Sequence, residues 1–246
     1  MKGIILAGGT GTRLFPLTKV TNKHLLPVGK YPMIYHAIYK LKQAGITDIL
    51  IVTGREHMGD VVNLLGSGYE FEVSFTYKVQ DQAGGIAQAL GLAKDFIGDD
   101  LMTVILGDNV FQDDISPFVQ NYIQQGGGAK ILLQQVPDPK RYGVAELYGN
   151  QIVSIEEKPQ EPKSEYAVTG IYMFDSSVFD IIQTLKPSGR GELEITDVNN
   201  EYIVRKQLTY DILNGWWTDA GTHPSLQKAN QLAYGLNFGE CFGILK

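Results

Sequence analysis

A cationic, glycine-rich stretch near the N-terminus contains the first residues whose types and spacing could do chemistry. Three glycines lie in it, Gly8, Gly9 and Gly11. Glycine accepts positive φ and carries no Cβ, so the backbone N–H groups of such a loop can approach an anion closely. Three cations follow in the same loop, Arg13, Lys19 and Lys23. Guanidinium and ammonium groups beside free amides are what a polyphosphate requires, and the pattern therefore predicts a phosphate-binding loop.

The order of residues in this loop separates it from two other phosphate motifs. A P-loop requires GxxxxGK[ST], and the sequence contains no Gly-Lys-Ser or Gly-Lys-Thr. A dinucleotide fingerprint requires GxGxxG leading into a helix, but Leu14 stands where the third glycine belongs, and Pro16 interrupts any helix. From the glycines alone, a turn with solvated charges explains the loop about equally well.

An aspartate at the end of the most apolar segment could hold a divalent cation. Residues 101–106 run directly into Gly107-Asp108-Asn109. Mg²⁺ prefers one or two carboxylates together with phosphate oxygens, and ligands of open α/β sheets bind at the carboxyl ends of strands. Asp-Asn is also a common turn. Because the phosphate-binding loop ends at the same edge of the predicted sheet, we favour a metal ligand at Asp108.

Two polar sites have both a functional and an ordinary explanation. The amide of Gln80 suits the edge of a base, and Gly85 permits close approach, although a glycine turn that begins a helix accounts for the same spacing. Glu157 and Lys158 follow a predicted strand, where a charged run is ordinarily solvated.

A third site lies near the C-terminus. Asp219 precedes a glycine and a predicted helix, so it could be a cap or turn residue. The adjacent Trp216 and Trp217 would form an apolar wall suited to stacking on a sugar ring.

Alternating strand and helix patterns must position these residues. Apolar runs and alternation predict strands over 2–6, 48–52, 73–80, 101–106, 130–134 and 166–174, and a hairpin of 141–147 with 151–156. Helical spacing predicts helices over 33–44, 58–65, 86–93, 115–125, 194–204 and 222–235. We therefore expect an α/β fold with a Rossmann-like, mostly parallel sheet flanked by helices and a smaller β-rich lobe. Residues 1–246 should form one domain, with a nucleotide-binding half (1–136) and a sugar-phosphate-binding half (137–246).

Composition limits the classes of partner and compartment. The 246 residues are 43% hydrophobic, enough to bury the core of one α/β domain. A net charge of -6 argues against binding a nucleic-acid polymer, so the cationic loop is a local site for small anions. The single cysteine, Cys241, excludes an internal disulfide, and the first apolar run is too short for a signal peptide or a membrane span. We expect a cytoplasmic protein.

The string GGTGTRLFPLTKVTNKHLLPV closely resembles the opening signature of the sugar-1-phosphate nucleotidyltransferases, and among them the glucose-1-phosphate thymidylyltransferases most. That signature is a glycine-rich loop with an arginine, then a proline, then Lys-x-Leu-Leu-Pro. Three more matches occur in the family's order, Tyr142-Gly143, Val168-Thr169-Gly170 and Arg190-Gly191-Glu192. The resemblance covers residues 2–226. Members of this family usually have a proline-rich segment between the residues that match Gln80 and Gly85, and this sequence lacks it.

The resemblance implies transfer of a nucleotidyl group from dTTP, or alternatively UTP, to glucose 1-phosphate with Mg²⁺. It assigns catalysis to Arg13, Lys23, Asp108, Lys158 and Asp219, and the metal to Asp108 and Asp219. It assigns the nucleotide to Leu6, Ala7, Gly8, Gly9, Gly11, Thr12, Arg13, Gln80, Gly85 and Asp108. It assigns the sugar phosphate to Asn109, Tyr142, Gly143, Glu157, Lys158, Val168, Arg190 and Trp217. A non-catalytic nucleotide-sugar sensor is the alternative class, but a sensor could lose Arg13, Asp108 and Asp219 without penalty.

The family also sets expectations about assembly and regulation. A homodimer or homotetramer is expected. Longer relatives carry a C-terminal helical extension that helps to form a second, regulatory nucleotide site, whereas only eleven residues follow Gly235 here. Because allostery needs two coupled sites, we expect any inhibition by a dTDP-sugar to be competitive at the active site.

Overall fold

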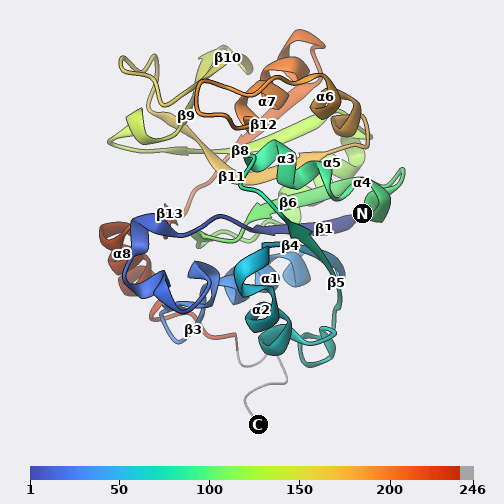
Figure 1. Cartoon of the computed structure of the whole chain (residues 1–246). Coiled ribbons are helices and arrows are strands. Elements are labelled where there is room, and N and C mark those ends of the chain that lie inside the picture. The colour runs from blue at the N-terminus through green and yellow to red at the C-terminus, as the bar shows by residue number, and fades with distance from the viewer. Residues whose placement is uncertain (239–246) are drawn as a thin grey trace.

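One mixed sheet runs through both halves of the chain (Figure 1). The computed structural model describes residues 1–238, so the predictions about Cys241 and about the end of the chain fall outside the described residues. Within residues 1–238 this sheet has nine strands in the order β10-β9-β11-β6-β1-β4-β5, with β8 paired to β11 and β12 paired to β8. They are β1 (Lys2–Ala7), β4 (Asp48–Gly54), β5 (Ser74–Gln80), β6 (Met102–Leu106), β8 (Ala129–Gln135), β9 (Gly143–Tyr148), β10 (Gln151–Glu157), β11 (Tyr166–Phe174) and β12 (Leu208–Ile212).

Four neighbouring strands of the first half are parallel, and the strands of the second half join the sheet mostly in antiparallel pairs. β5, β4, β1 and β6 pair in parallel, and β11 then joins β6 in the opposite direction. β9 and β10 form the predicted hairpin. The predicted α/β fold with a β-rich lobe is confirmed.

Helices cover both faces of the sheet, which is why its inner strands are apolar throughout. The helices are α1 (Met33–Gln43), α2 (Met58–Leu65), α3 (Ile86–Gly91), α4 (Lys94–Ile97), α5 (Ser116–Gln125), α6 (Val178–Thr184), α7 (Ile195–Val204) and α8 (His223–Ala233). Neighbouring residues of β1 point to opposite faces, so Ile5 packs in the core with α1 and α2 while Ile4 packs in the core with α3, α6 and α7. Both cores are continuous with the sheet, so its strand ends are held rigidly.

The sequence patterns do not predict two short strands, which pair with each other beyond the carboxyl end of β6. β7 (Asn109–Phe111) and β13 (Trp217–Asp219) pair antiparallel, with Asp219 opposite Asn109. The patterns also miss α6 and β12. Three-residue strands carry too little local periodicity to be recognised, because each is stabilised only by its distant partner.

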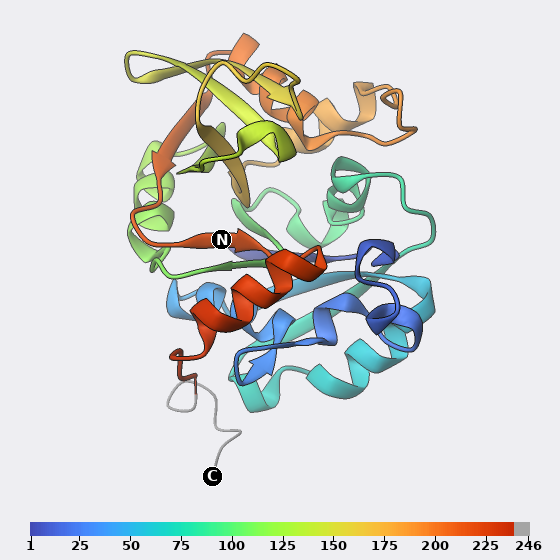
Figure 2. The ribbon, with the colours of Figure 1, turned by 90° about the vertical axis from the view of Figure 1, so that its left-hand side faces the viewer.

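The C-terminal helix returns to the first half of the chain. Figure 2 shows α8, in red, lying beside the blue N-terminal segment. It contacts the short hairpin of β2 (Pro27–Val28) with β3 (Tyr31–Pro32), and Leu226 and Ala229 pack in a third apolar cluster with Leu14. No helix in residues 1–238 has both the length and the apolar character needed to cross a bilayer.

A buried lysine ties α1 to both short strands. Lys40 Nζ donates to the carbonyl oxygens of Gln112 and Asp113, each at 2.7 Å. The Asp113 carboxylate in turn accepts from the backbone N–H groups of Asn214 at 2.7 Å and Gly215 at 2.6 Å, just before β13. Burial lowers the pKa of Lys40 from 10.5 to about 8, although Asp114 and Asp113 oppose the shift.

This shift predicts a pH-dependent stability. Above the folded-state pKa of Lys40 the native protein is neutral there, whereas the unfolded chain still binds the proton, so stability rises with pH. Relative to Lys40→Met, the wild-type free energy of unfolding should increase by about 2 kcal/mol between about pH 8 and about pH 10, at about 1.4 kcal/mol per pKa unit. Urea unfolding at several pH values measures it. Parallel curves for the two proteins would contradict the shift.

Candidate active site

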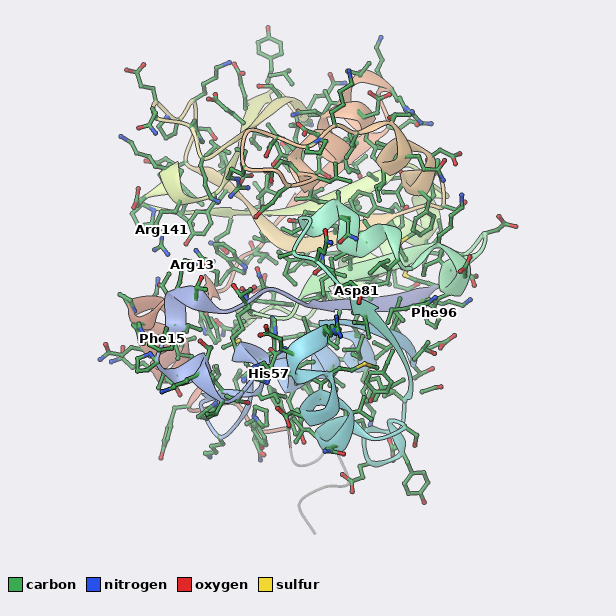
Figure 3. The ribbon with its side chains drawn as sticks, viewed as in Figure 1. Arg13, Phe15, His57, Asp81, Phe96 and Arg141 are labelled. Atoms are coloured by element: carbon green, nitrogen blue, oxygen red, sulfur yellow. The ribbon has the colours of Figure 1, made fainter. Side chains whose placement is uncertain are left out.

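A cavity of about 360 Å³ opens at the carboxyl ends of β1, β5 and β6, below the β9–β10 hairpin. Most of the predicted site residues line it, namely Leu6, Gly8, Gly9, Arg13, Lys23, Gln80, Gly85, Asp108, Asn109, Tyr142, Gly143, Glu157, Lys158, Val168, Trp217 and Asp219. Figure 3 shows Arg13 and Arg141 close together at one end of the gap between the two halves. The topology therefore brings both predicted half-sites to one place.

Four of the residues that the family resemblance assigns do not line this cavity, Ala7, Gly11, Thr12 and Arg190. The Ala7 carbonyl accepts a hydrogen bond from Asn22 instead. Gly11 has φ +63, and a Cβ there would lie 2.8 Å from Thr18 Cγ2, so this glycine is required by the fold of the loop itself.

Asp108 and Asp219 face one small space. The Ala220 N–H donates to the Asp108 carbonyl at 2.7 Å, which fixes the segment after β13 beside the end of β6. A Cβ on Gly221 would lie 3.4 Å from Asp108 Oδ2 and 3.6 Å from Asp219 Oδ2. Glycine thus keeps free a space that both carboxylates border. This donor set suits Mg²⁺, which combines one or two protein carboxylates with phosphate oxygens and water.

The described residues contain no group of three or more His, Cys, Asp or Glu side chains that could hold a metal ion. The two carboxylates would therefore share such an ion with substrate and water oxygens.

The two acids have different electrostatic surroundings. Burial alone would raise the pKa of Asp108, but Lys23 Nζ at 2.5 Å and Asn109 Nδ2 at 3.0 Å hold this pKa well below its usual range. Burial raises the pKa of Asp219, and the charge of Asp108 adds to it, while Arg141 and Arg13 oppose the shift. The pair is thus a concentrated negative charge that requires cations.

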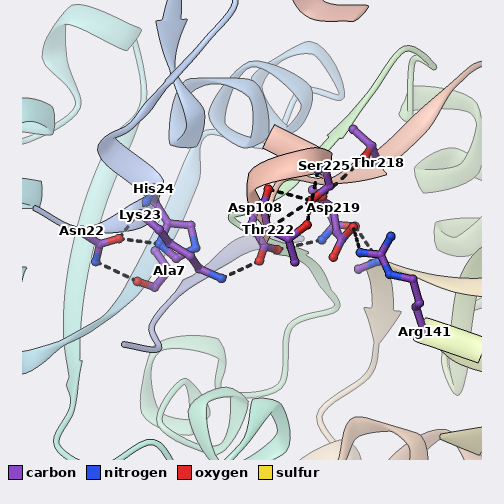
Figure 4. A network of polar contacts seen from close by, with 12 residues as sticks. Ala7, Asn22, Lys23, His24, Asp108, Arg141, Thr218, Asp219, Thr222 and Ser225 are labelled. Carbon is purple, nitrogen blue, oxygen red and sulfur yellow. Dashed lines mark hydrogen bonds and ion pairs between the residues drawn. The ribbon is translucent and has the colours of Figure 1, made fainter. Parts of the chain in front are cut away.

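Lys23 is flanked in the chain by two buried residues that sequence reasoning missed, Asn22 and His24 (Figure 4). Asn22 Oδ1 accepts from the His24 backbone N–H at 2.9 Å and lies 2.7 Å from His24 Nδ1. Asn22 Nδ2 donates to Ala7 O and Thr53 Oγ1, both at 3.3 Å. Burial, then Lys23, lowers the pKa of His24 to about 3, so its ring is neutral. All polar groups of the Asn22 side chain are used, and the only sequence signal for this role is adjacency to Lys23.

On the nucleotide side, Gln80 lies directly against the glycine-rich loop. A Cβ on Gly8 would lie 2.5 Å from Gln80 Oε1, so residue 8 must be glycine for this approach. Gln80 Nε2 donates to Gln88 Oε1 at 2.6 Å and to Gly85 O at 3.2 Å. Gly85 precedes α3 with φ +100, and a Cβ there would lie 2.4 Å from Leu193 O. The ordinary explanation for Gly85, a helix-start glycine, is therefore part of its role.

In the second half, Glu157 Oε2 accepts from Thr196 Oγ1 at 2.8 Å, and Lys158 Nζ lies 3.4 Å from Glu157 Oε1. Arg190 is outside the cavity, where it donates to the Glu194 carboxylate at 2.7 and 3.1 Å. The cavity instead contains Arg141, which sequence reasoning missed. The sequence feature that could have indicated Arg141 is its position directly before the motif Tyr142-Gly143.

Asn109 joins three segments behind the carboxylates. Its Oδ1 accepts from Gly170 N at 2.9 Å and from Trp217 Nε1 at 2.6 Å. Only Trp217 lines the cavity, while Trp216 packs against the cluster under α8. The predicted wall of two tryptophans is therefore wrong, because adjacent strand residues point to opposite sides.

Gly170→Ala tests this junction. The new Cβ would lie 2.5 Å from Asn109 Nδ2. The overpacking should destabilise the protein by about 1 to 3 kcal/mol, and the lost Trp217 hydrogen bond should change the tryptophan fluorescence. Urea unfolding and emission spectra measure both effects. Gly189→Ala is the control, since a Cβ there has no neighbour within 4 Å; equal behaviour of the two variants would refute the role of Asn109.

Comparison with known proteins agrees with this geometry. The family described as nucleotidyl transferase matches residues 2–234. Glucose-1-phosphate thymidylyltransferase of Neisseria meningitidis is 46% identical over 233 residues, 93% of this chain and 81% of that protein. The Mycolicibacterium smegmatis enzyme of the same name is 43% identical over 249 residues, 97% of this chain and 86% of that protein.

Solved structures agree as well. A Bacillus anthracis chain, crystallised with sucrose and provisionally assigned as a glucose-1-phosphate thymidylyltransferase, is 69% identical with a TM-score of 0.95, and the match covers 99% of both chains. UDP-glucose pyrophosphorylase in complex with UDP-glucose is 26% identical with a TM-score of 0.82, over 95% of this chain and 98% of the other. This chain belongs to the nucleotidyl transferase family and is an enzyme of sugar-phosphate nucleotidyl transfer.

Proposed function

We propose that the enzyme transfers dTMP from dTTP to glucose 1-phosphate and releases pyrophosphate, giving dTDP-glucose. The observation that carries this proposal is the shared space between Asp108 and Asp219, bordered by Arg13 and open to a cavity that also contains Lys23 and Lys158. Two carboxylates with three cations are suited to two anionic reactants and a divalent metal. The relatives named glucose-1-phosphate thymidylyltransferase support the choice of substrates.

The reaction is a displacement at phosphorus. An oxygen of the sugar phosphate attacks the α-phosphorus of the triphosphate, a P–O bond forms, and the bond to the pyrophosphate oxygen breaks. Both reactants are anions, so their repulsion and alignment account for much of the barrier. Mg²⁺, held by Asp108 and Asp219, would supply charge neutralisation at the phosphates.

The chain's own residues would orient the reactants and balance their charge. Arg13 and Lys23 neutralise charge on the departing pyrophosphate, and Lys158 meets the attacking phosphate beside Glu157, which accepts hydrogen bonds from sugar hydroxyls. Gln80 faces the base. A second cavity of about 490 Å³ shares Gly9, Lys23, Gln80 and Ala83 with the first, and gives the nucleotide side further room.

UTP is the alternative nucleotide. The likeness to UDP-glucose pyrophosphorylase favours it as a second candidate. The two bases differ by one methyl group, which in an apolar pocket contributes only about 1 to 3 kcal/mol to discrimination.

The direct test is pyrophosphate release over a matrix of triphosphates and sugar 1-phosphates. Release should require a triphosphate, a hexose 1-phosphate and Mg²⁺ together, with dTTP and glucose 1-phosphate giving the highest kcat/KM. Asp108→Asn should abolish it, because one of the two charged metal ligands is lost. Asp114→Asn, an exposed carboxylate away from the cavity, is the matched control. Full activity in excess EDTA would exclude the metal-dependent reaction.

Arg13 provides a second test. If it meets charge that develops mainly in the transition state, Arg13→Ala should lower kcat by about 10²- to 10³-fold, as does loss of an oxyanion donor. Lys19, which the sequence pattern grouped with Arg13 and Lys23, lies outside the cavity, so Lys19→Ala should leave kcat unchanged. Steady-state kinetics measure kcat and KM for both variants. A change of Arg13→Ala confined to KM would mean that Arg13 binds the ground state and the transition state equally.

A further inference from the structure

Arg141 is the cavity cation to which the proposed mechanism gives no role. It ends the short turn η6 (Pro139–Arg141) and lines the same cavity as Lys158. Its Nη2 lies 3.8 Å from Asp219 Oδ1, an oxygen that also accepts from the Tyr142 hydroxyl at 3.3 Å (Figure 4). Among residues 1–238 its guanidinium donates no hydrogen bond, its central carbon lies 5.6 Å from the centre of the Tyr142 ring, and the side chain is 44% exposed. Arg141 is thus a loosely held charge at the mouth of the site.

Two other cations, Lys23 and Arg190, are held more firmly, whereas Lys158, at 3.4 Å from Glu157 and 45% exposed, is not. Lys23 lies 2.5 Å from Asp108, and both side chains of that pair are only 14% exposed. Arg190, which the family resemblance places on the sugar phosphate, donates twice to Glu194 and also lies 3.7 Å from Glu157. Among the guanidinium groups of the second half, Arg141 is the one that lines the cavity, and its carboxylate partner is more distant than that of Arg190.

We propose that Arg141 neutralises Asp219 while the metal is absent and turns to the phosphate of the sugar 1-phosphate once a divalent cation occupies the two carboxylates. This inference rests on the proposed function and deepens it. A planar guanidinium can bind two phosphate oxygens at once, whereas the Lys158 ammonium acts as a point charge.

The physical reason is a change in the sign of the local charge. Without metal, Asp219 stands near the charged Asp108, and a nearby guanidinium offsets their repulsion. A divalent cation between the carboxylates offsets that repulsion itself and repels Arg141. The incoming phosphate then offers Arg141 a new anionic partner in the same cavity. Metal binding and sugar-phosphate binding are then coupled, since each favours the same position of Arg141.

The coupling predicts two effects of opposite sign in Arg141→Gln. The substrate-free protein should bind Mn²⁺ about two- to fivefold more tightly, because an exposed competing cation is gone. The KM for glucose 1-phosphate should rise about tenfold or more, because a charge-assisted contact is lost, while the KM for dTTP changes little. Arg141→Lys keeps the positive charge, so its Mn²⁺ affinity should return most of the way to the wild-type value. Its KM for glucose 1-phosphate should return less far, because an ammonium group does not bind two phosphate oxygens as a planar guanidinium does. Paramagnetic titration and steady-state kinetics measure these quantities.

Lys140→Gln is the matched control, because it removes the same charge from the neighbouring exposed position outside the cavity, and it should change neither constant. Unchanged or weaker Mn²⁺ binding by Arg141→Gln, or an unchanged KM for glucose 1-phosphate, overturns the role of Arg141. A variant that loses thermal stability with both constants worsened would show a purely structural role. A wild-type protein that binds no Mn²⁺ and transfers no nucleotide overturns the proposed function together with this inference.

Discussion

Two carboxylates that must lie close together despite their like charge are the constraint on which the site depends. Asp108 lies two residues beyond the end of β6 and Asp219 ends β13, and the pairing of β7 with β13 brings them to one space across more than a hundred residues of sequence. Two buried like charges are unfavourable unless cations or a metal ion accompany them. The N-terminal loop supplies Lys23 and Arg13 for this purpose, and the β-rich lobe supplies Arg141. Each half of the chain thus supplies one of the two carboxylates together with cations that offset the charge of the pair.

Buried amides give this charged centre its rigidity. Asn22 connects Lys23 to the ends of β1 and β4, and Asn109 connects Asp108 to Gly170 and Trp217. A buried polar group without a partner costs about 1 to 3 kcal/mol, so these fully bonded side chains strongly favour a single arrangement. Lys40 and Asp113 apply the same principle farther out, because they tie α1 to both short strands through backbone groups. The charged groups are therefore positioned before any ligand binds, as electrostatic preorganisation requires.

The distribution of charge separates this local site from the whole molecule. The net charge is -6, yet the cavity contains Arg13, Lys23, Arg141 and Lys158. A local concentration of cations attracts small anions even in an acidic protein, while the overall charge disfavours polyanions. Within the cavity, Lys23 is 14% exposed and lies 2.5 Å from Asp108, whereas Arg141 is 44% exposed and lies 3.8 Å from Asp219, so Arg141 has more freedom to adjust.

The sequence by itself determined the local structure and the chemical character of the site. The helix over 58–65 and the strands at 2–6 and 101–106 could be predicted because their periodicity and end signals are contained in each segment. The sequence motifs likewise predicted Arg13, Asp108 and Lys158 as site residues, and all three line the cavity. Only the tertiary structure decided that β7 pairs with β13, that Trp217 and not Trp216 lines the cavity, and that Arg141 lies inside while Arg190 is bound by Glu194. These outcomes depend on contacts between residues far apart in the chain, and no local pattern encodes which distant partner a side chain meets.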